Sequence, residues 1–398
     1  MGRPGADTVG RQSGAPSIVE TAVLFLRLGT TAFGGPAAHT ALMEHEVVGR
    51  RRWLTREQFL DYVGATNLIP GPNSTELAIH IGMARHGWAG LLVAGCCFIL
   101  PAALLVGGMA WAYVRYGALP DVAGILQGIV PVVIAIIVSA LWQLGRTAVK
   151  SAGLAVLGLV ALVALLAGVH ELVVLLVAGI ASALSAGGIP WKRRLAVMGG
   201  IAGGWTSSAG LAAAVAAGTG PAGAFSLWSL FLVFARIGSV LFGSGYVLIA
   251  FLRADVVERL GWITERQLLD AVAVGQITPG PLFTTATFVG YLVGGAAGAA
   301  VATAGIFLPA FAFVALSGPL VPRLRRSRAA GAVLDGVNVA SLALMAAVTL
   351  QLSVTTLRAP VPLALAGLSL VMLTRYRANP TWLVAGGAAA GWILERSS

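Results

Sequence analysis

The sequence has few charged residues. Of its 398 residues only 10% are Asp, Glu, Lys or Arg, whereas 58% are hydrophobic and the mean hydropathy is +0.88. A soluble globular protein carries about 25% charged residues. So few charges cannot cover a surface that faces water. The composition therefore excludes an ordinary soluble fold and predicts an all-α polytopic membrane protein in contact with the lipid bilayer.

Cysteine and known catalytic motifs are scarce as well. The two cysteines, Cys96 and Cys97, are adjacent in an apolar run, which excludes a disulfide framework and a zinc site. The five histidines show no metal-ligand spacing, and no Walker loop, His-Glu-x-x-His or Gly-x-Ser-x-Gly motif is present. We therefore expect no metal, no cofactor, no catalytic residue and no ATP-driven step on this chain.

The net charge of +11 comes from 26 Lys and Arg residues that lie mostly in short gaps between apolar runs. This distribution is typical of membrane-topology determinants. No basic stripe interleaved with aromatic residues occurs, so we expect no nucleic-acid partner. Residues 1–16 are polar and lack the short apolar core of a cleavable signal peptide, and we expect them to form a cytoplasmic tail.

The sequence contains an internal repeat. At a shift of 209 positions, about 19 of 58 residues between Phe25 and Gly82 are identical without gaps, far more than chance gives. The matches include Trp53 with Trp262 and the two Pro-Gly-Pro triplets that begin at Pro70 and Pro279. The repeat predicts four regions: an N-terminal tail at 1–16, a first repeat at 17–190, a connecting span at 191–224 and a second repeat at 225–398.

About 20 apolar residues are needed for each membrane span. This length predicts spans near 18–40, 57–86, 88–114, 122–145, 149–168 and 171–188 in the first repeat, and near 226–251, 266–294, 297–320, 331–353, 359–374 and 380–395 in the second. One more run, 195–217, lies between them, which gives 13 spans. An odd connecting span makes the second repeat enter the membrane from the opposite side, an inverted-topology repeat.

Charges in the loops test this topology. With a cytoplasmic N-terminal tail, Lys150, Lys192–Arg194, Arg323–Arg328 and Arg375 all lie inside, as the positive-inside rule requires. Arg50–Arg52 would lie outside and violate the rule. Two explanations stay open: the topology of the first segment differs, or these arginines serve an external anion.

The segments 57–86 and 266–294 cannot be plain helices. Each begins with a capping box, Thr55 with Gln58 and Thr264 with Gln267, and each is interrupted by Pro-Gly-Pro. A proline inside a helix costs roughly 3 kcal/mol, and a bilayer tolerates unpaired backbone only where it lines a protein cavity. Each segment is therefore two half-helices in a broken span, or a re-entrant hairpin; the loop charges favour the broken span.

A half-helix that begins after Pro-Gly-Pro directs free N–H groups and a positive dipole end into the membrane interior. This arrangement predicts an anion site, against the simpler alternative that the prolines only kink a helix for packing. Its candidate residues are the triplets and the polar side chains after them, together with the glycines of an earlier break: Pro70, Gly71, Pro72, Asn73, Ser74, Thr75, Pro279, Gly280, Pro281, Thr284, Thr285, Gly34 and Gly35.

Each repeat carries one arginine on its apolar first helix, Arg27 and Arg236. An arginine within a membrane costs at least about 2.5 kcal/mol on insertion scales, so it should face a cavity or a partner. Its forked donors suit an oxyanion, and we include both arginines in the substrate site. The alternative is that both side chains reach to the membrane surface.

Several other polar residues lie within apolar runs and could line a transport path or carry protons. They are Asn67 and Gln276, which precede the two triplets, and the unmatched Glu76, Asp335 and Asn338. Two Gly-x-x-x-Gly patterns, at Gly199 and Gly387, indicate close helix packing and are compatible with a homodimer.

Phe33-Gly34-Gly35-Pro36 and Trp53-Leu54-Thr55 ahead of Pro70-Gly71-Pro72, with the second Trp-Ile-Thr and Pro-Gly-Pro at 262–264 and 279–281, resemble the chromate ion transporter family in its long two-domain form. The resemblance covers nearly the whole chain. It implies efflux of chromate across the inner membrane, driven by the proton-motive force, with sulfate as a competitor. The second copy has Ser244-Gly245 where the first has Gly35-Pro36, so the two halves are expected to differ in binding.

The sequence therefore predicts a secondary oxyanion transporter that holds its anion near the membrane midplane. The alternatives that the residues leave open are a carrier or exchanger of sulfate or another small anion, and an anion channel, because inverted repeats with interrupted helices occur in channels too.

Overall fold

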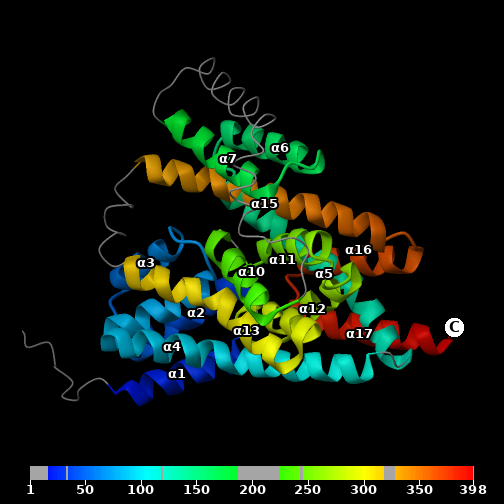
Figure 1. The fold of residues 1–398 in the computed structure, drawn as a ribbon, viewed down its shortest axis with the longest axis horizontal. Coiled ribbons are helices and arrows are strands. Elements are labelled where there is room, and N and C mark those ends of the chain that lie inside the picture. Colours follow the sequence, from blue (N-terminus) through cyan, green and yellow to red (C-terminus); the bar gives the residue numbers. More distant parts are fainter. Residues whose placement is uncertain are drawn as a thin grey trace, which may run out of the picture.

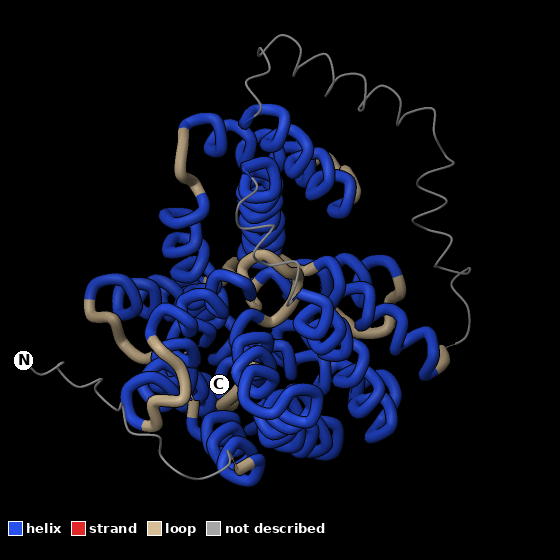
Figure 2. Tube along the Cα trace, turned by 90° about the vertical axis from the view of Figure 1, so that its left-hand side faces the viewer, coloured by secondary structure: helices blue, strands red, loops and turns tan. Residues whose placement is uncertain are grey.

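The computed structural model describes residues 17–32, 35–117, 120–186, 225–242, 245–317 and 328–397. Throughout these ranges the chain consists of helices and loops, with no strand (Figure 2). The predicted connecting span, the N-terminal tail and the Gly-x-x-x-Gly pattern at Gly199 lie outside the described residues. The boundaries of the four regions stay predictions.

The two repeats give corresponding series of helices (Figure 1). The first repeat contains α1 (Ile18–Thr31), α2 (Gly35–Glu44), the π-helix η1 (His45–Arg50), α3 (Arg56–Thr66), α4 (Asn73–Tyr116), α5 (Pro120–Ala148), α6 (Ala152–Leu166) and α7 (Glu171–Ala186). The second contains α10 (Leu227–Val240), α11 (Val247–Leu252), the π-helix η2 (Arg253–Arg259), α12 (Glu265–Ile277), the 3-10 turn η3 (Leu282–Thr284), α13 (Thr285–Ser317), α15 (Arg328–Thr356), α16 (Pro360–Arg375) and α17 (Pro380–Ser397).

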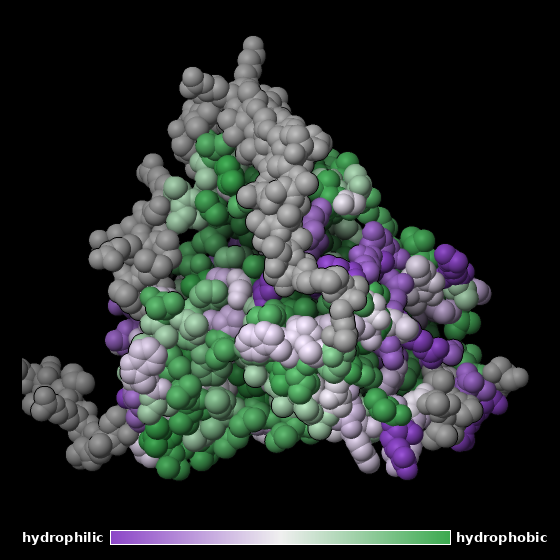
Figure 3. Space-filling model, viewed as in Figure 1, coloured by the Kyte–Doolittle hydropathy of each residue, from purple (hydrophilic) through white to green (hydrophobic). Residues whose placement is uncertain are grey.

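The molecule is an all-α membrane protein. Four of the described helices are long and apolar enough to cross a membrane, namely Asn73–Tyr116, Gly124–Ala148, Leu282–Ser317 and Ala329–Thr356. Apolar side chains cover much of the face shown in Figure 3. Large ones such as Leu104 and Leu316 are about 70% exposed, as expected for residues that face lipid rather than water.

The Pro-Gly-Pro segment of the first repeat is a helical hairpin. The Tyr62 and His80 rings stack with centroids 5.4 Å apart, and Arg85 lies over the Trp53 ring at 3.9 Å. Residues that come later in α4 therefore contact residues that come earlier in the α3 region, which makes α3 and the start of α4 antiparallel. The expectation of a broken span is corrected here: both half-helices enter and leave at the same end, and Pro-Gly-Pro forms the tip.

The preceding segment, 18–50, is a hairpin as well. Arg51 pairs with Glu20 in the first turn of α1 at 3.4 Å, and Arg27 pairs with Glu46 at 3.7 Å. The chain thus runs inward along α1 and returns along α2 and η1, so Arg50–Arg52 lie at the end where α1 begins. The expected single span 18–40 is instead divided between two helices of this hairpin, α1 and α2. The count of 13 spans stays a prediction that these hairpins do not support.

In each repeat, the helical arm that follows Pro-Gly-Pro ends in a sharp reversal of the chain, within α4 in the first repeat and within α13 in the second. The elements α4 and α13 each consist of two helical arms, joined at His86–Gly87 and Gly294–Gly295, where the backbone is non-helical and φ is near +60° at the second residue of each pair. Close contact follows, between Gly82 and Gly90 and between Gly290 and Gly298, where any Cβ would overlap the opposite backbone. The long remainder of each helix then crosses the molecule.

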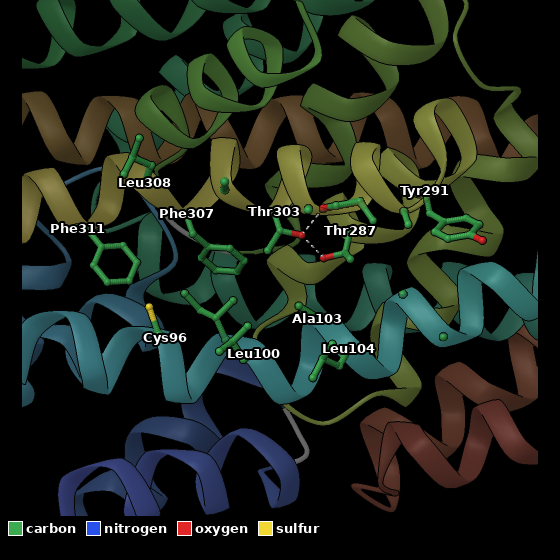
Figure 4. Close-up of a pocket in the computed structure, with 17 residues that line it drawn as sticks. Cys96, Leu100, Ala103, Leu104, Thr287, Tyr291, Thr303, Phe307, Leu308 and Phe311 are labelled. Atoms are coloured by element: carbon green, nitrogen blue, oxygen red, sulfur yellow. Dashed lines mark hydrogen bonds between the residues drawn. The ribbon is translucent and has the colours of Figure 1, made fainter. Parts of the chain in front are cut away.

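The repeats exchange helices in the body of the fold. Helix α5 of the first repeat packs on α16 and α17 of the second, and α15 of the second packs on α6 and α7 of the first. Gly128 lies against the backbone of Gly387 and Gly391, so the predicted role of that glycine pattern in helix packing is confirmed. The long parts of α4 and α13 pack antiparallel: Gly95 of α4 lies against Phe311, and along the groove between the two helices the order from Cys96 to Leu104 runs in the same direction as that from Phe311 back to Thr303 (Figure 4).

Candidate functional site

The two Pro-Gly-Pro tips meet in the interior and each binds the other repeat. The Gly71 N–H donates to the carbonyl oxygen of Leu241 at 2.8 Å, and the Gly280 N–H donates to that of Ala32 at 3.0 Å. Ala32 and Leu241 cap the C-termini of α1 and α10 and correspond to each other in the repeat. Each tip is therefore held against the end of the other repeat's first helix.

Glycine is required at both tips. Gly71 has φ 141° and Gly280 has φ 95°, values that L side chains rarely adopt. A Cβ at Gly71 would overlap the Glu76 carboxyl group, and one at Gly280 would overlap Ala102. The predicted capping boxes, Thr55 with Gln58 and Thr264 with Gln267, are confirmed and start the two hairpins.

Two helix N-termini converge on one small interior cavity. Helix α4 starts at Asn73 after Pro72, and η3 with α13 starts at Leu282 after Pro281; in neither case does a cap side chain bond to the first turn. The first amides of a helix lack intrahelical partners and carry its positive dipole end. The cavity, which we call the junction cavity, is lined by His39, Pro72, Asn73, Ser74, Gly245, Pro281, Leu282 and Phe283.

The hydroxyl groups near the junction differ between the repeats. Thr284 and Thr285 donate to the carbonyl oxygens of Pro281 and Leu282 at 2.9 Å and 2.8 Å, so their protons are engaged by their own turn. Ser74 is buried and lines the cavity, and the buried Thr75 hydroxyl has no polar partner among the described residues. The first repeat therefore supplies the hydroxyls that remain available.

Two ionisable side chains lie at this junction. His39, on α2, is only 2% exposed; its Nε2 bonds the Ala32 carbonyl oxygen at 3.1 Å, and its Nδ1 has no partner among the described residues. Glu76 is fully buried beside Gly71, and neither carboxyl oxygen has a polar partner there. Sequence reasoning identified Glu76 but missed His39, although its position just after the Phe33–Pro36 break was a usable signal.

A larger polar cavity, which we call the access cavity, opens beside the first tip, between the end of α5, α11 and α15. Asn67 and Asn73 line it from the tip, with a hydrogen bond of 2.9 Å from the Asn73 amide to the Asn67 oxygen. Asp335 and Asn338 line it from α15. The structure thus brings together four of the predicted residues and adds Lys150, which the prediction missed and whose ammonium group donates to Asp335 at 2.6 Å.

Gln276 takes no part in the access cavity. It is half-buried behind the second tip, where it bonds Tyr246, and its amide nitrogen has no partner within the described part of the chain. Gly34 lies outside the described residues, and Gly35 begins α2 at the inner end of the first hairpin.

Arg27 and Arg236 line neither of these cavities. Each pairs with a carboxylate on the returning arm of its own hairpin, Arg27 with Glu46 and Arg236 with Asp255. Both carboxylates are almost fully buried, and they match each other in the repeat. This match was readable from the 209-residue shift, but the prediction did not use it.

An apolar groove between α4 and α13 is not suited to an anion. Figure 4 shows its lining, in which Leu100, Leu104 and Leu308 are typical. Its two threonines, Thr287 and Thr303, share a hydrogen bond of 2.7 Å with each other. Among the described residues, no group of three or more His, Cys, Asp or Glu side chains could hold a metal ion.

A model of the family described as "Chromate transporter" matches the chain twice, over residues 19–183 and 228–392. The chain belongs to the chromate transporter family. It is 32% identical to the chromate transport protein of Cupriavidus metallidurans and 31% identical to that of Pseudomonas aeruginosa, over 93% of this chain and 91% of each relative. A probable chromate transport protein of Synechococcus elongatus is 30% identical over 82% of both chains. No solved structure matches the chain.

The family assignment confirms the resemblance seen in the sequence. The two matched ranges are separated by 209 residues at their starts and at their ends, the same separation as that between the two Pro-Gly-Pro tips. In this chromate transporter family member, the tips that meet at the junction cavity therefore come from equivalent places in two copies of one family unit.

Proposed function

We propose that this protein exports chromate from the cytoplasm across the inner membrane as a secondary transporter. The observation that carries the proposal is the junction cavity, where the N-termini of α4 and η3–α13 converge from two family repeats. Helix N-termini bind anions through free amides and a positive dipole end. The curated relatives named as chromate transport proteins support chromate as the anion.

The tips and the residues after them form the proposed substrate site. Pro70, Gly71, Pro72, Pro279, Gly280 and Pro281 set the backbone of the two tips. Gly34 and Gly35 are included on the strength of the glycine break in the sequence. Asn73, Ser74 and Thr75 supply side-chain donors, while Thr284 and Thr285 fix the turn that carries the second set of amides. Because the cavity is small and both tips are bonded across it, we propose that the tips separate to admit the anion.

The access cavity is the proposed route from the cytoplasm to the junction. Asn73 lines both cavities, and Asn67, Asn338 and Asp335 continue the polar lining outward. The Lys150 side chain is 62% exposed at the rim, where a positive charge attracts an anion. Gln276 is assigned to the opposite, outward part of the path.

The topology that fits best is an inverted repeat with two re-entrant hairpins in each half. The long parts of α4 and α13 are antiparallel, as inversion requires. If the hairpins of the first repeat do not cross, the N-terminal tail, Arg50–Arg52 and Lys150 share one side. The positive-inside rule makes that side cytoplasmic and removes the violation at Arg50–Arg52.

Arg27 and Arg236 are proposed to supply positive charge near the path, held in place by Glu46 and Asp255. Glu76 is proposed to line the junction in its neutral form, because an ionised carboxyl group beside a dianion would repel it. Asp335 is proposed to balance Lys150 at the entrance.

The electrical part of the proton-motive force can drive this export. Moving one elementary charge across the membrane changes its free energy by about 2.3 kcal/mol per 100 mV. Export of a dianion from a negative interior is therefore favoured by about 4.6 kcal/mol at 100 mV. Sulfate has the same shape and charge and is the proposed competitor. Because Gly387 and Gly391 pack inside the chain, the glycine pattern gives no specific support to a homodimer.

The test is chromate uptake into everted membrane vesicles that contain the protein, with a positive-inside diffusion potential and a pH gradient imposed separately. Saturable uptake that follows the potential, shows counterflow and is inhibited by sulfate would support the proposal. Matched vesicles without the protein provide the control. Uptake of sulfate without chromate would make the chain a carrier of another anion, and non-saturable conductance would make it a channel.

A further inference from the structure

We propose that His39 is a ligand of the transported oxyanion and binds it through Nδ1 only when the imidazole is protonated. The inference rests on the proposed function and names a residue that neither the repeat nor the family motifs indicate. The equivalent position in the second repeat is Leu248, so the junction would carry one such group, not two.

The position of His39 directs it at the junction. It lies near the start of α2, and its ring packs edge-on against Phe98 at 5.6 Å, which restricts its orientation. It shares the junction cavity with Asn73 and Ser74 of one helix N-terminus and Leu282 of the other. Its exposed fraction of 2% shields the ring from bulk solvent.

The hydrogen bonds of the ring decide what Nδ1 can do. A carbonyl oxygen only accepts, so His39 Nε2 must carry the proton in its 3.1 Å bond to Ala32. The same oxygen accepts the Gly280 N–H, which ties the ring to the second tip. In the neutral ring Nδ1 is then an unshared lone pair, which repels an oxyanion. In the cation it is an N–H donor that carries charge.

Helix α2 packs against η1, α4, α1 and α3, and of these η1 carries His45, Glu46 and Arg50 and α3 carries Arg56, Glu57, Asp61 and Tyr62. The helix α1 offers Glu20 and Arg27, of which Arg27 is paired with Glu46. The first arm of α4 offers Glu76 and His80, followed by Arg85 and His86 at the far end of the hairpin. The second tip and α13 carry no ionisable side chain from Pro281 to Phe288. Glu76 is the group on α4 closest in sequence to the cavity, so the test must separate it from His39.

Proton binding and anion binding at one site reinforce each other. Above the pKa of the imidazole, the apparent affinity should fall about tenfold for each unit of pH. A proton that travels with the anion would also reduce the exported charge from two to one.

The experiment measures chromate binding to the purified full-length protein by equilibrium dialysis, between about pH 6 and pH 8. The comparison is between wild type and His39→Gln, in which an amide keeps a donor but cannot titrate. Taking the ratio of the two dissociation constants at each pH cancels the titration of chromate itself. His45→Gln, at an exposed histidine on η1, is the matched control, and Glu76→Gln tests the nearby carboxyl group.

We expect the logarithm of the dissociation constant to rise with pH at the same slope in the wild type, His45→Gln and Glu76→Gln. In His39→Gln this slope should be smaller by about one. Proton uptake on chromate binding to the wild type, measured in weak buffer, gives a second readout that does not depend on a folded variant. An unchanged slope in His39→Gln, or binding without proton uptake, would overturn the inference and leave the transporter proposal standing. No chromate binding by the wild type at any pH would overturn both.

Discussion

The amide of Gly71 donates a hydrogen bond of 2.8 Å to the carbonyl oxygen of Leu241, which joins the tip of one repeat to the end of the first helix of the other. The Gly280 amide makes the equivalent bond to Ala32 at 3.0 Å. Together the two bonds hold the tips against the opposite repeats, next to the junction cavity. Each bond also gives a partner to one backbone N–H at a tip, where an unpaired group would be costly within a membrane.

Substitution of the tip glycines should reduce transport strongly. Gly71→Ala forces a left-handed backbone on a residue with a Cβ and overlaps Glu76, at a cost of about 1–3 kcal/mol. We expect a lower melting temperature in detergent and loss of chromate flux. Gly108→Ala is the control, because a Cβ there meets no atom within 4 Å. Equal behaviour of the two variants would contradict the role of the tip.

The ion pair between Arg236 and Asp255 should stabilise the fold, in addition to holding the positive charge of Arg236 near the path. Asp255 is 2% exposed and bonds both Arg236 and Arg259, so Asp255→Asn should destabilise the protein by about 3 kcal/mol. Glu44→Gln breaks the exposed pair with Arg56 and should cost under about 1 kcal/mol. Thermal unfolding in detergent measures both.

The double variant Arg236→Gln with Asp255→Asn separates the two roles of that arginine. Removing both charges should recover part of the lost stability, because neither partner is left alone in the interior. Chromate flux should stay low if Arg236 supplies charge to the path. Recovery of full flux would show that Arg236 only serves the hairpin.

The positive charge of Lys150 at the entrance of the access cavity should strengthen the initial binding of chromate. Lys150→Gln removes the ammonium group at the rim of the access cavity, and we expect a several-fold higher KM for chromate with little change in kcat, most visible at low salt. Stability should change little, because the Lys150 side chain is 62% exposed. Arg146→Gln, in the last turn of α5 shortly before Lys150, does not line the cavity and is the control. A KM shift of the same size in both would contradict the assignment.

The hairpin topology predicts opposite accessibility at equivalent positions. Glu57 and Arg266 correspond in the repeat, and both are exposed near the start of a Pro-Gly-Pro hairpin. In a background with Cys96→Ala and Cys97→Ala, Glu57→Cys should react with a membrane-impermeant thiol reagent from the cytoplasmic side. Arg266→Cys should react from the outside. Labelling of both from one side would exclude the inverted repeat.

Much of the site was readable from the sequence, because its parts are local. Pro-Gly-Pro cannot continue a helix, and the capping boxes mark where each hairpin begins, so the tips and their N-terminal amides follow from residues a few positions apart. The cluster at Asn67, Asn73, Asp335 and Asn338 was predicted only as separate residues. What brought them together is the packing of α15 beside the first tip.

The rest depends on contacts between distant residues. The hairpin was mistaken for a broken span because its antiparallel pairing rests on the Tyr62–His80 stack and the Trp53–Arg85 contact, which have no sequence signature. The packing of helices of one repeat against helices of the other could not be predicted from the sequence either. His39 escaped because Leu248 occupies its place in the second repeat, so a search for matched residues passed over it.

Locating the bound anion would test the proposed substrate site directly. We would determine the structure of the protein crystallised with chromate and collect data at the chromium absorption edge, so that anomalous scattering marks the metal centre of the substrate. We predict a peak at the junction cavity, within hydrogen-bonding reach of Ser74, His39 and the amides at Leu282. A peak confined to another part of the molecule, with none between the two tips, would contradict it.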